Sequence, residues 1–329
     1  LKLNAKLGLI AAAFLTTAVL VAWLLVSRIN IEVNTLTRQD QGQAGVANGI
    51  SLMAELAKHD VNSGSAGSAE ITRLQALVKA TATEIAIDER MTELLGALDE
   101  SVQSALQPEE DPNLRKQRHL AAIGATMRTV SAIGDDSGLN RVRDTHTYYL
   151  SSMMVGDLPI LLDRSMRLRA LGALVIETGA VWVDDRIDIV GAMRDMDRAK
   201  DELALAIERV KTYEAARAGE LDGSRAALVS SIEALRDRIQ GEVLDAEEIT
   251  MDTAELDQLS ANVVAALEST DVLLGQLLNA RMDDRLSSLS TERNLVIGGV
   301  ILALLIAGYL FLGFTRSVSA AVREIGASA

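Results

Sequence analysis

The sequence predicts an all-α protein in which long helices form a bundle between two transmembrane helices. Apolar residues recur at helical spacing along most of the chain, and no strand-like alternation persists. Aromatic residues make up only 3% of the 329 residues and there are three prolines, a composition typical of helical bundles rich in Ala and Leu. Residues 7–26 and 294–314 are uncharged apolar segments, each long enough to cross about 30 Å of hydrocarbon as a helix.

The two apolar segments divide the chain into five parts. Basic residues at positions 2, 6, 316 and 323 flank the segments on their outer sides, which favours a cytoplasmic location for both termini. The first segment is longer than an ordinary signal-peptide core, so we expect it to be retained. The expected parts are a cytoplasmic N-terminus (1–6), a first transmembrane helix (7–26), a periplasmic helical domain (27–293), a second transmembrane helix (294–314) and the start of a cytoplasmic helix (315–329).

The charge of the chain excludes two classes of partner. The whole chain carries a net charge of −14, and the part between the two apolar segments has 28 basic and 45 acidic residues, a net charge of −17. Such a surface repels nucleic acid and anionic lipid headgroups. Cysteine is absent, so the domain folds without disulfides. We therefore expect no nucleic-acid partner.

Breaks in the helical pattern predict the elements of the external domain. Turn-forming residues and prolines interrupt the apolar periodicity at intervals, and capping residues follow several of these breaks. The number of segments fits either one four-helix bundle with extra helices or two stacked four-helix modules. The expected helices cover the residues from the first span to about 60, then 69–106, 112–133, 139–155, 158–179, 184–218 and 224–240, and a last helix that begins after Asp252 and continues into the second span. Loops are expected at 62–67, 107–111, 134–138 and 219–223.

Residue types and spacings give no support for catalysis. The three histidines have no second histidine three or four residues away, and there is no cysteine to ligate a metal. Neither a glycine-rich phosphate loop nor a serine in a nucleophile elbow occurs. We expect no enzymatic activity, no catalytic residue, no metal site and no cofactor.

Residues 136–177 are the most informative part of the external domain. Two adjacent tyrosines occur there in an aromatic-poor domain, together with several arginines. The planar guanidinium fork suits carboxylate recognition, so this segment predicts a ligand site. Adjacent helical residues point in different directions, so we expect one tyrosine in the core and the other at a pocket or interface. The candidate ligand-binding residues are Arg141, Arg143, His146, Tyr148, Tyr149, Arg164 and Arg167.

A second interpretation of the same arginines is structural. In that interpretation Arg164, Arg167 and Arg169 form ion pairs with neighbouring acids on the same or adjacent helices. The expected acidic partners are Asp144, Asp157 and Asp163.

The same segment resembles bacterial transmembrane chemoreceptors (methyl-accepting chemotaxis proteins). Residues 136–150, from Asp-Ser-Gly-Leu to Tyr-Tyr-Leu, are similar to a receptor segment of the form D-S-x-L-x-x-D-P-D-x-D-S-Y-Y-L-M-D. Its continuation, L-P followed by L-R-x-L-G, matches residues 158–159 and 168–172. The sequence departs from the pattern at four positions, where it has Val142, Arg143, His146 and Ser152.

The end of the chain is similar to the second span and first residues of a HAMP linker. Residues 308–314 and Arg316-Ser317-Val318 carry this likeness, although alanines at 320 and 321 stand near the position where the linker usually has a proline. The resemblance implies a homodimeric inner-membrane receptor with a four-helix or helical bimodular sensor domain, truncated at the start of HAMP. It also implies an organic-anion ligand or a periplasmic binding protein as partner, and cytoplasmic signalling proteins that act on the following region.

The expected function is therefore that of a chemotaxis receptor that senses a small organic anion. One alternative is the input region of a sensor histidine kinase or cyclase. Another is a ligand-free, membrane-tethered structural protein, for which the arginines would be fully paired and no pocket would lie between the helices.

Overall fold

The computed structural model describes residues 3–61, 67–86, 88–142 and 144–327. Within these ranges the chain is helical apart from short connections, and no strand occurs in them, which confirms the all-α prediction. The helices are α1 (Leu3–Val61), α2 (Ser68–Ile85), α3 (Glu89–Leu106), α4 (Pro112–Ser137), η1 (Leu139–Arg141), α5 (Thr145–Ser152), η2 (Met153–Asp157), α6 (Leu158–Thr178), α7 (Val183–Lys211), η3 (Ala215–Arg217), α8 (Ala218–Ile239), η4 (Gln240–Leu244) and α9 (Thr253–Ala327).

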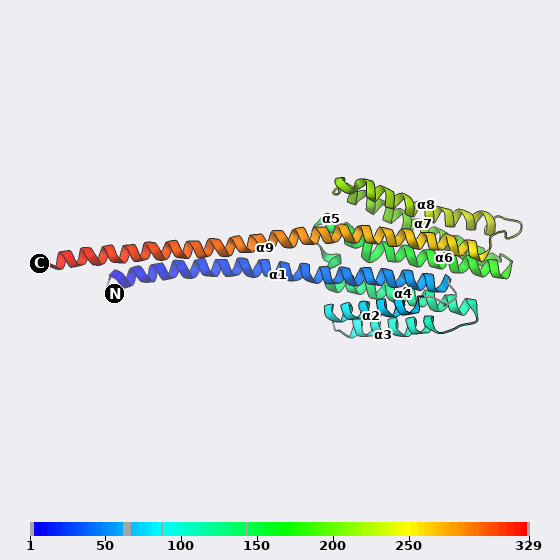
Figure 1. Ribbon diagram of the computed structural model, residues 1–329, viewed down its shortest axis with the longest axis horizontal. Helices are drawn as coiled ribbons and strands as arrows, with labels where there is room; N and C mark the ends of the chain where they lie inside the picture. The colour runs from blue at the N-terminus through cyan, green and yellow to red at the C-terminus, as the bar shows by residue number, and fades with distance from the viewer. Residues whose placement is uncertain (1–2, 62–66, 87, 143, 328–329) are drawn as a thin grey trace. The chain divides into compact units, whose positions relative to one another are not determined.

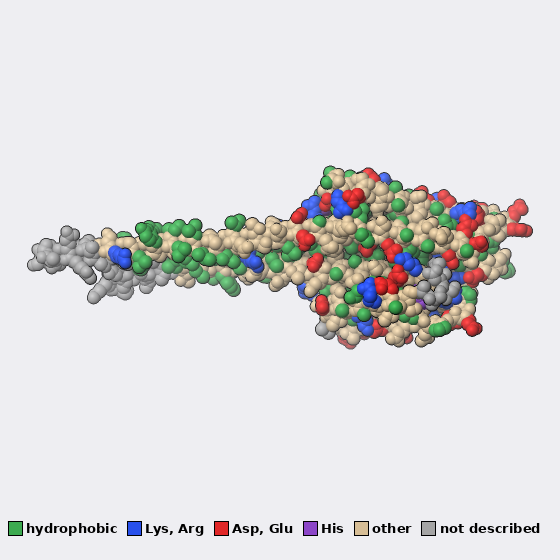
Figure 2. Space-filling model, viewed as in Figure 1, with side chains coloured by type: hydrophobic (Ala, Val, Ile, Leu, Met, Phe, Trp, Pro, Cys, Tyr) green, Lys and Arg blue, Asp and Glu red, His purple; other side chains and the backbone are tan. Residues whose placement is uncertain are grey.

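The chain forms two compact units. Unit 1 consists of Leu1–Thr37 and Met282–Ala329, and unit 2 of Arg38–Arg281. In unit 1, α1 and α9 run in opposite directions (Figure 1), with Ile29 and Leu289 buried and an ion pair between Glu32 and Arg285. Its surface is rich in hydrophobic side chains, whereas charged residues gather on the surface of unit 2 (Figure 2). By length and composition, α1 and α9 are each apolar enough to span a membrane.

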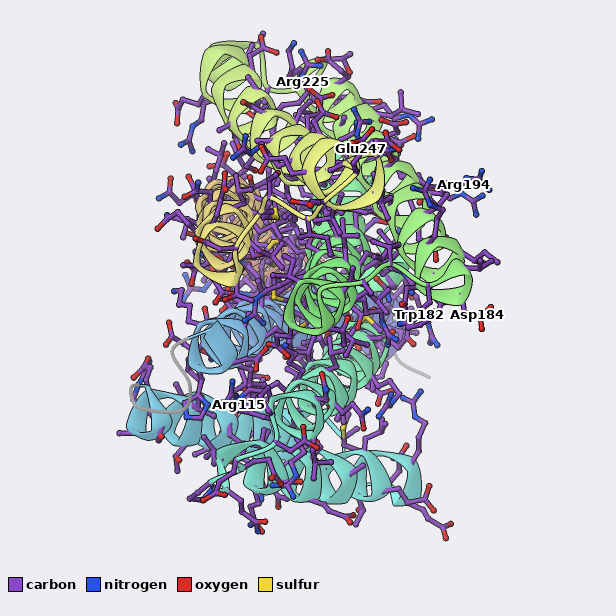
Figure 3. All side chains as sticks on the ribbon, turned by 90° about the vertical axis from the view of Figure 1, so that its right-hand side faces the viewer. Arg115, Trp182, Asp184, Arg194, Arg225 and Glu247 are labelled. Carbon is purple, nitrogen blue, oxygen red and sulfur yellow. The ribbon has the colours of Figure 1, made fainter. Side chains whose placement is uncertain are left out.

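Unit 2 contains two groups of four helices. The first group comprises α2, α3, α4 and the part of α1 that lies in unit 2, and the second comprises α6, α7, α8 and the corresponding part of α9 (Figures 1 and 3). The four helices α1, α4, α6 and α9 lie in the middle and join the groups. Gln43 Nε2 on α1, for example, donates to the carbonyl oxygen of Gly275 on α9 at 3.0 Å.

Three glycines let α1 approach its neighbours closely. A Cβ at Gly42 or Gly49 would collide with Ser137 or Val130 of α4, and one at Gly45 would lie 2.6 Å from Thr81 Cγ2 of α2. These helices therefore pack with almost no side-chain spacer on α1, in contrast to Leu-lined bundle seams.

Capping residues explain most helix starts. Asp111 accepts a hydrogen bond from the backbone N–H of Asn113, and Pro112 follows at the first helical position, as the sequence predicts. Asp252 likewise accepts from the N–H of Glu255 and begins α9. Asp185 accepts from the N–H of Trp182 at the start of α7. The predicted loop at 62–67 lies outside the described residues except for Gly67, which precedes α2.

The helices differ from the prediction at three breaks. The predicted helix 69–106 is two helices, because Ala86 is extended and Asp88 caps α3 by accepting from the N–H of Met91. The predicted helix 112–133 continues to Ser137 and ends at Gly138, which has a positive φ of 82°. The predicted loop at 219–223 is wrong, since these residues lie inside α8 and the turn comes earlier, after Lys211.

The segment 139–158 also folds differently. The predicted helix 139–155 is interrupted between η1 and α5, where Asp144 caps α5. The order Asp157, Leu158, Pro159 in the sequence predicts a helix cap at Asp157, and this prediction is wrong. The φ of Asp157 is helical, at −66°, and a π-helical turn (η2) joins α5 to α6. The π turn accommodates Pro159, which has no N–H to donate to the preceding turn.

Candidate functional site

A cavity of about 440 Å³ opens between the α5–η2 segment and α7. The Asp144 cap sets the start of α5: its carboxylate accepts from the N–H of Thr147 at 2.9 Å. The π turn then carries the chain into α6, which packs along α7. The side chains around the cavity are those of Tyr148, Tyr149, Ser152, Asp157, Glu202, Leu205, Ala206 and Arg209.

Both tyrosines of the predicted site line this cavity. Their rings meet edge to face with centroids 5.6 Å apart, and Tyr148 is 43% exposed. The Arg209 guanidinium carbon lies 5.3 Å from the centroid of the Tyr149 ring, a cation–π contact. The expectation that one tyrosine enters the core is therefore wrong. Neither ring is buried, because long side chains on adjacent helical positions can both lean toward the same opening.

The charged side chains of the cavity are unpaired. Among the described residues, the side chains of Asp157, Glu202 and Arg209 have no ion pair and no hydrogen bond. Burial, and next the negative charge of Glu202, raise the pKa of Asp157 to about 6. Among the described residues, the cavity thus holds two unpaired carboxyl groups and one guanidinium without a carboxylate partner, beside two aromatic rings.

The predicted arginines lie elsewhere. Arg167 Nε donates to Asp163 Oδ2 at 2.8 Å, and Arg164 lies 3.8 Å from the same oxygen, so both pair within α6 as the structural interpretation expects. Arg141 is exposed on η1 and lines neither described cavity. Arg143 lies outside the described residues. Of the six predicted site residues that the structure describes, only the two tyrosines line the cavity.

His146 is a buried residue of α5. Its ring stacks on that of Tyr213, with centroids 5.3 Å apart, and Nε2 lies 3.4 Å from Glu214 Oε1. Burial and the positive charge of Arg281 lower the pKa of His146. His146 therefore joins α5 to the turn that follows α7, and it does not line the cavity.

A buried ionic cluster joins the four central helices. Arg169 forms ion pairs, as the structural interpretation expects, but its partners are not the expected Asp144, Asp157 or Asp163. Arg169 on α6 donates to Asp60 on α1 and, at 2.8 Å, to Asp257 on α9. Arg115 of α4, labelled in Figure 3, lies 3.8 Å from Asp60. Arg169 is only 4% exposed. One feature of the sequence indicates that Arg169 is buried. It lies between Leu168 and Gly172, on the face that the apolar periodicity assigns to the core.

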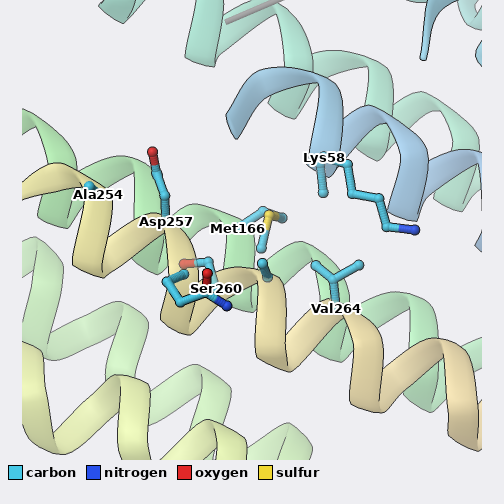
Figure 4. A pocket seen from close by; sticks show the side chains of 9 residues that line it. Lys58, Met166, Ala254, Asp257, Ser260 and Val264 are labelled. Carbon is cyan, nitrogen blue, oxygen red and sulfur yellow. The ribbon is translucent and has the colours of Figure 1, made fainter. Parts of the chain in front are cut away.

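A second cavity of about 350 Å³ opens beside this cluster, between α1, α6 and α9 (Figure 4). Its charged side chains are already engaged. Lys58 pairs with Glu55 and with Glu268 at 2.8 Å, and Asp257 pairs with Arg169. This cavity offers a ligand fewer free partners than the one at the tyrosines.

Comparison with models of protein families, with curated proteins and with solved structures finds no match for this chain. Within the described residues, no group of three or more His, Asp or Glu side chains is placed to hold a metal ion. The cavity at Tyr148 and Tyr149 is the candidate functional site, because its polar groups are unpaired and accessible.

Proposed function

We propose that the chain is the sensor region of a two-pass chemotaxis receptor in the bacterial inner membrane, with unit 2 in the periplasm. The observation that carries the proposal is α9. This one helix, Thr253–Ala327, contributes Leu256, Val263 and Leu274 to the core of unit 2 and also contains the most apolar segment of the chain. A helix built in this way can carry a conformational difference across a membrane.

The signal would be a small displacement of α9. Helix shifts of about 1–2 Å are usual in receptors and other switching proteins. A ligand drives such a shift only if it binds the two states of the bundle with different affinity. The cavity at Tyr148 and Tyr149 supports a directly bound ligand, and its existence argues against a ligand-free structural role.

The test is a receptor chimaera. Residues 1–329 are fused to the HAMP linker and cytoplasmic domain of a chemoreceptor, and the activity of its partner kinase is followed in membranes against small carboxylates, amino acids and amines. We expect at least one compound to change kinase activity at least twofold. The same cytoplasmic domain without residues 1–329 is the control. If no compound changes the output of an inserted chimaera, the sensor function is wrong.

The membrane topology can be tested separately by labelling single introduced cysteines, because the chain has no native cysteine. Ala216 is exposed in unit 2, and Ser317 is exposed on α9 beyond the second apolar segment. We expect a membrane-impermeant maleimide to label Ala216→Cys in cells with a permeabilised outer membrane. It should label Ser317→Cys only after lysis. The reverse pattern would contradict a periplasmic unit 2.

A further inference from the structure

We propose that the cavity between α5–η2 and α7 binds a small organic compound by its primary ammonium group, held between Asp157, Glu202 and the ring of Tyr148. The inference rests on the proposed sensor function, of which it names the ligand chemistry. It replaces the expectation of a simple organic anion with a ligand that must carry a positive charge.

An ammonium ligand would balance the charge of the cavity. Most charged side chains of unit 2 that face one another are paired, as Lys79 is with Asp99 and Lys200 with Asp197. Asp157 and Glu202 are different, because both line the same cavity, the negative charge of Glu202 acts on Asp157, and neither has a described cationic partner. An ammonium group placed between them would relieve this repulsion and supply three hydrogen-bond donors.

The aromatic wall of the cavity also favours a cationic ligand. Tyrosine rings attract cations through their negative faces, most strongly where water is partly excluded. The ring of Tyr149 already makes a cation–π contact with Arg209. The ring of Tyr148 has no described cation over it and is 43% exposed, so it is available to a ligand.

Arg209 determines which ammonium compounds fit best. Its guanidinium has no described carboxylate partner and lies on the same wall of the cavity as Glu202, two turns along α7. A ligand that carries a carboxylate as well as an ammonium group would contact both side chains, with its carboxylate at Arg209 and its ammonium group at Glu202. The cavity of about 440 Å³ has the size of ordinary small-molecule sites, so it admits either an amine or an amino acid.

Three probes with the same five-carbon chain separate these possibilities. Pentylamine carries only the ammonium group, norvaline carries both charged groups, and pentanoate carries only the carboxylate. Binding to the full chain in detergent is measured by calorimetry at pH 7.5. We expect pentylamine or norvaline, or both, to bind and pentanoate to bind at least tenfold more weakly. Binding of pentylamine would point to amines as the source, and binding of norvaline alone to amino acids.

Variants locate the site. Glu202→Gln should weaken ammonium binding at least tenfold, and Asp157→Asn should weaken it in the same direction. Arg209→Ala should weaken the binding of norvaline but not that of pentylamine. Asp195→Asn, which removes an exposed and unpaired carboxylate from α7 outside the cavity, is the matched control and should change nothing. All four positions are partly or fully exposed, so folding should be retained.

The inference is overturned if neither ammonium probe binds, if pentanoate binds as tightly as they do, or if Glu202→Gln leaves their affinity unchanged. These results are distinct from failure of the sensor function. A chimaera that responds to pentanoate would keep the sensor function and overturn the ammonium site. Binding of norvaline at the site without any response of α9 would support the ammonium site and contradict the sensor function.

Discussion

His59 Nδ1 lies 2.8 Å from His119 Nε2, and this contact between α1 and α4 determines how both rings are protonated. His119 Nδ1 lies 2.9 Å from the carbonyl oxygen of Arg115, so it must carry a proton and donate it. His119 Nε2 is then the acceptor, and His59 Nδ1 donates to it. His59 Nε2 accepts from the Ser68 hydroxyl at 3.2 Å. Each ring in this hydrogen-bond chain carries one proton and is neutral.

Acid should break this chain. Burial lowers the pKa of both histidines, and for His59 the neighbouring ring is the next cause. Because the unfolded state takes up protons first, the stability that the two rings contribute is present above pH 6.5 and is lost as the pH falls below it. Each histidine that stays neutral then costs about 1.4 kcal/mol per pH unit. Thermal melting at pH 7.5 and 5.5 should show a larger loss for the natural chain than for His59→Gln/His119→Gln. Equal losses would contradict the assignment.

The buried Arg169 on α6 should contribute far more to stability than an arginine in a fully exposed ion pair. Arg169→Ala leaves Asp60 and Asp257 without their main partner at the junction of four helices. Loss of one member of a buried ion pair costs about 3–5 kcal/mol. Arg73→Ala is the control, because both side chains of its pair with Glu70 are exposed, 57% and 43%, so the pair should contribute under about 1 kcal/mol. Urea titration of both variants measures the difference, and similar midpoints would refute the proposed role of Arg169.

Close helix packing predicts opposite signs for two glycine substitutions. Gly45→Ala forces a methyl group against Thr81, and overpacking of this kind destabilises by about 1–3 kcal/mol. Gly96 lies in α3 with nothing within 4 Å of a Cβ, so Gly96→Ala should stabilise by about 0.5–1 kcal/mol through helix propensity. Melting temperatures that move in the same direction would show that α1 does not need the close approach.

Asp271 on α9 is a buried carboxyl group, and its Oδ1 has no hydrogen-bond partner among the described residues. Burial, and then the charge of Glu268, raise its pKa to about 7. The folded state therefore favours the protonated form, and stability is lost as the pH rises from about 4 through 7. Asp271→Asn should stabilise by about 4 kcal/mol at pH 8, and the gain should vanish near pH 4. A gain independent of pH would contradict a buried charge at this position.

Much of the fold follows from local signals in the sequence. The two apolar segments, the cap at Asp111 with Pro112 and the start of α9 after Asp252 are residue patterns with a direct physical cause. The errors arose where tertiary packing outweighed composition. Gly219 and Gly223 look like a turn, yet both lie inside α8, while the turn after Lys211 has no strong breaker. The cap at Asp88 does not stand out in the sequence, because the apolar pattern continues across it.

The candidate site was predictable only in part. The adjacent tyrosines indicated the neighbourhood, but Glu202 and Arg209 come from α7, more than 50 residues later, and only the packing of α7 against α5 brings them there. Local sequence also could not separate Arg167, which pairs with Asp163 in the same helix, from Arg169, whose partners lie on α1 and α9. Long-range partners of this kind depend on tertiary structure.

The central claim is that a ligand bound in unit 2 moves α9 against α1 in unit 1. The pair Glu32 and Arg285 marks facing positions on these helices, and the absence of native cysteine allows Glu32→Cys/Arg285→Cys to be studied in the full chain in nanodiscs. The rate of disulfide formation is measured with and without whichever probe binds in calorimetry. We predict at least a twofold change at saturating ligand, reversed by Glu202→Gln. An identical rate with the ligand bound would contradict transmission through α9.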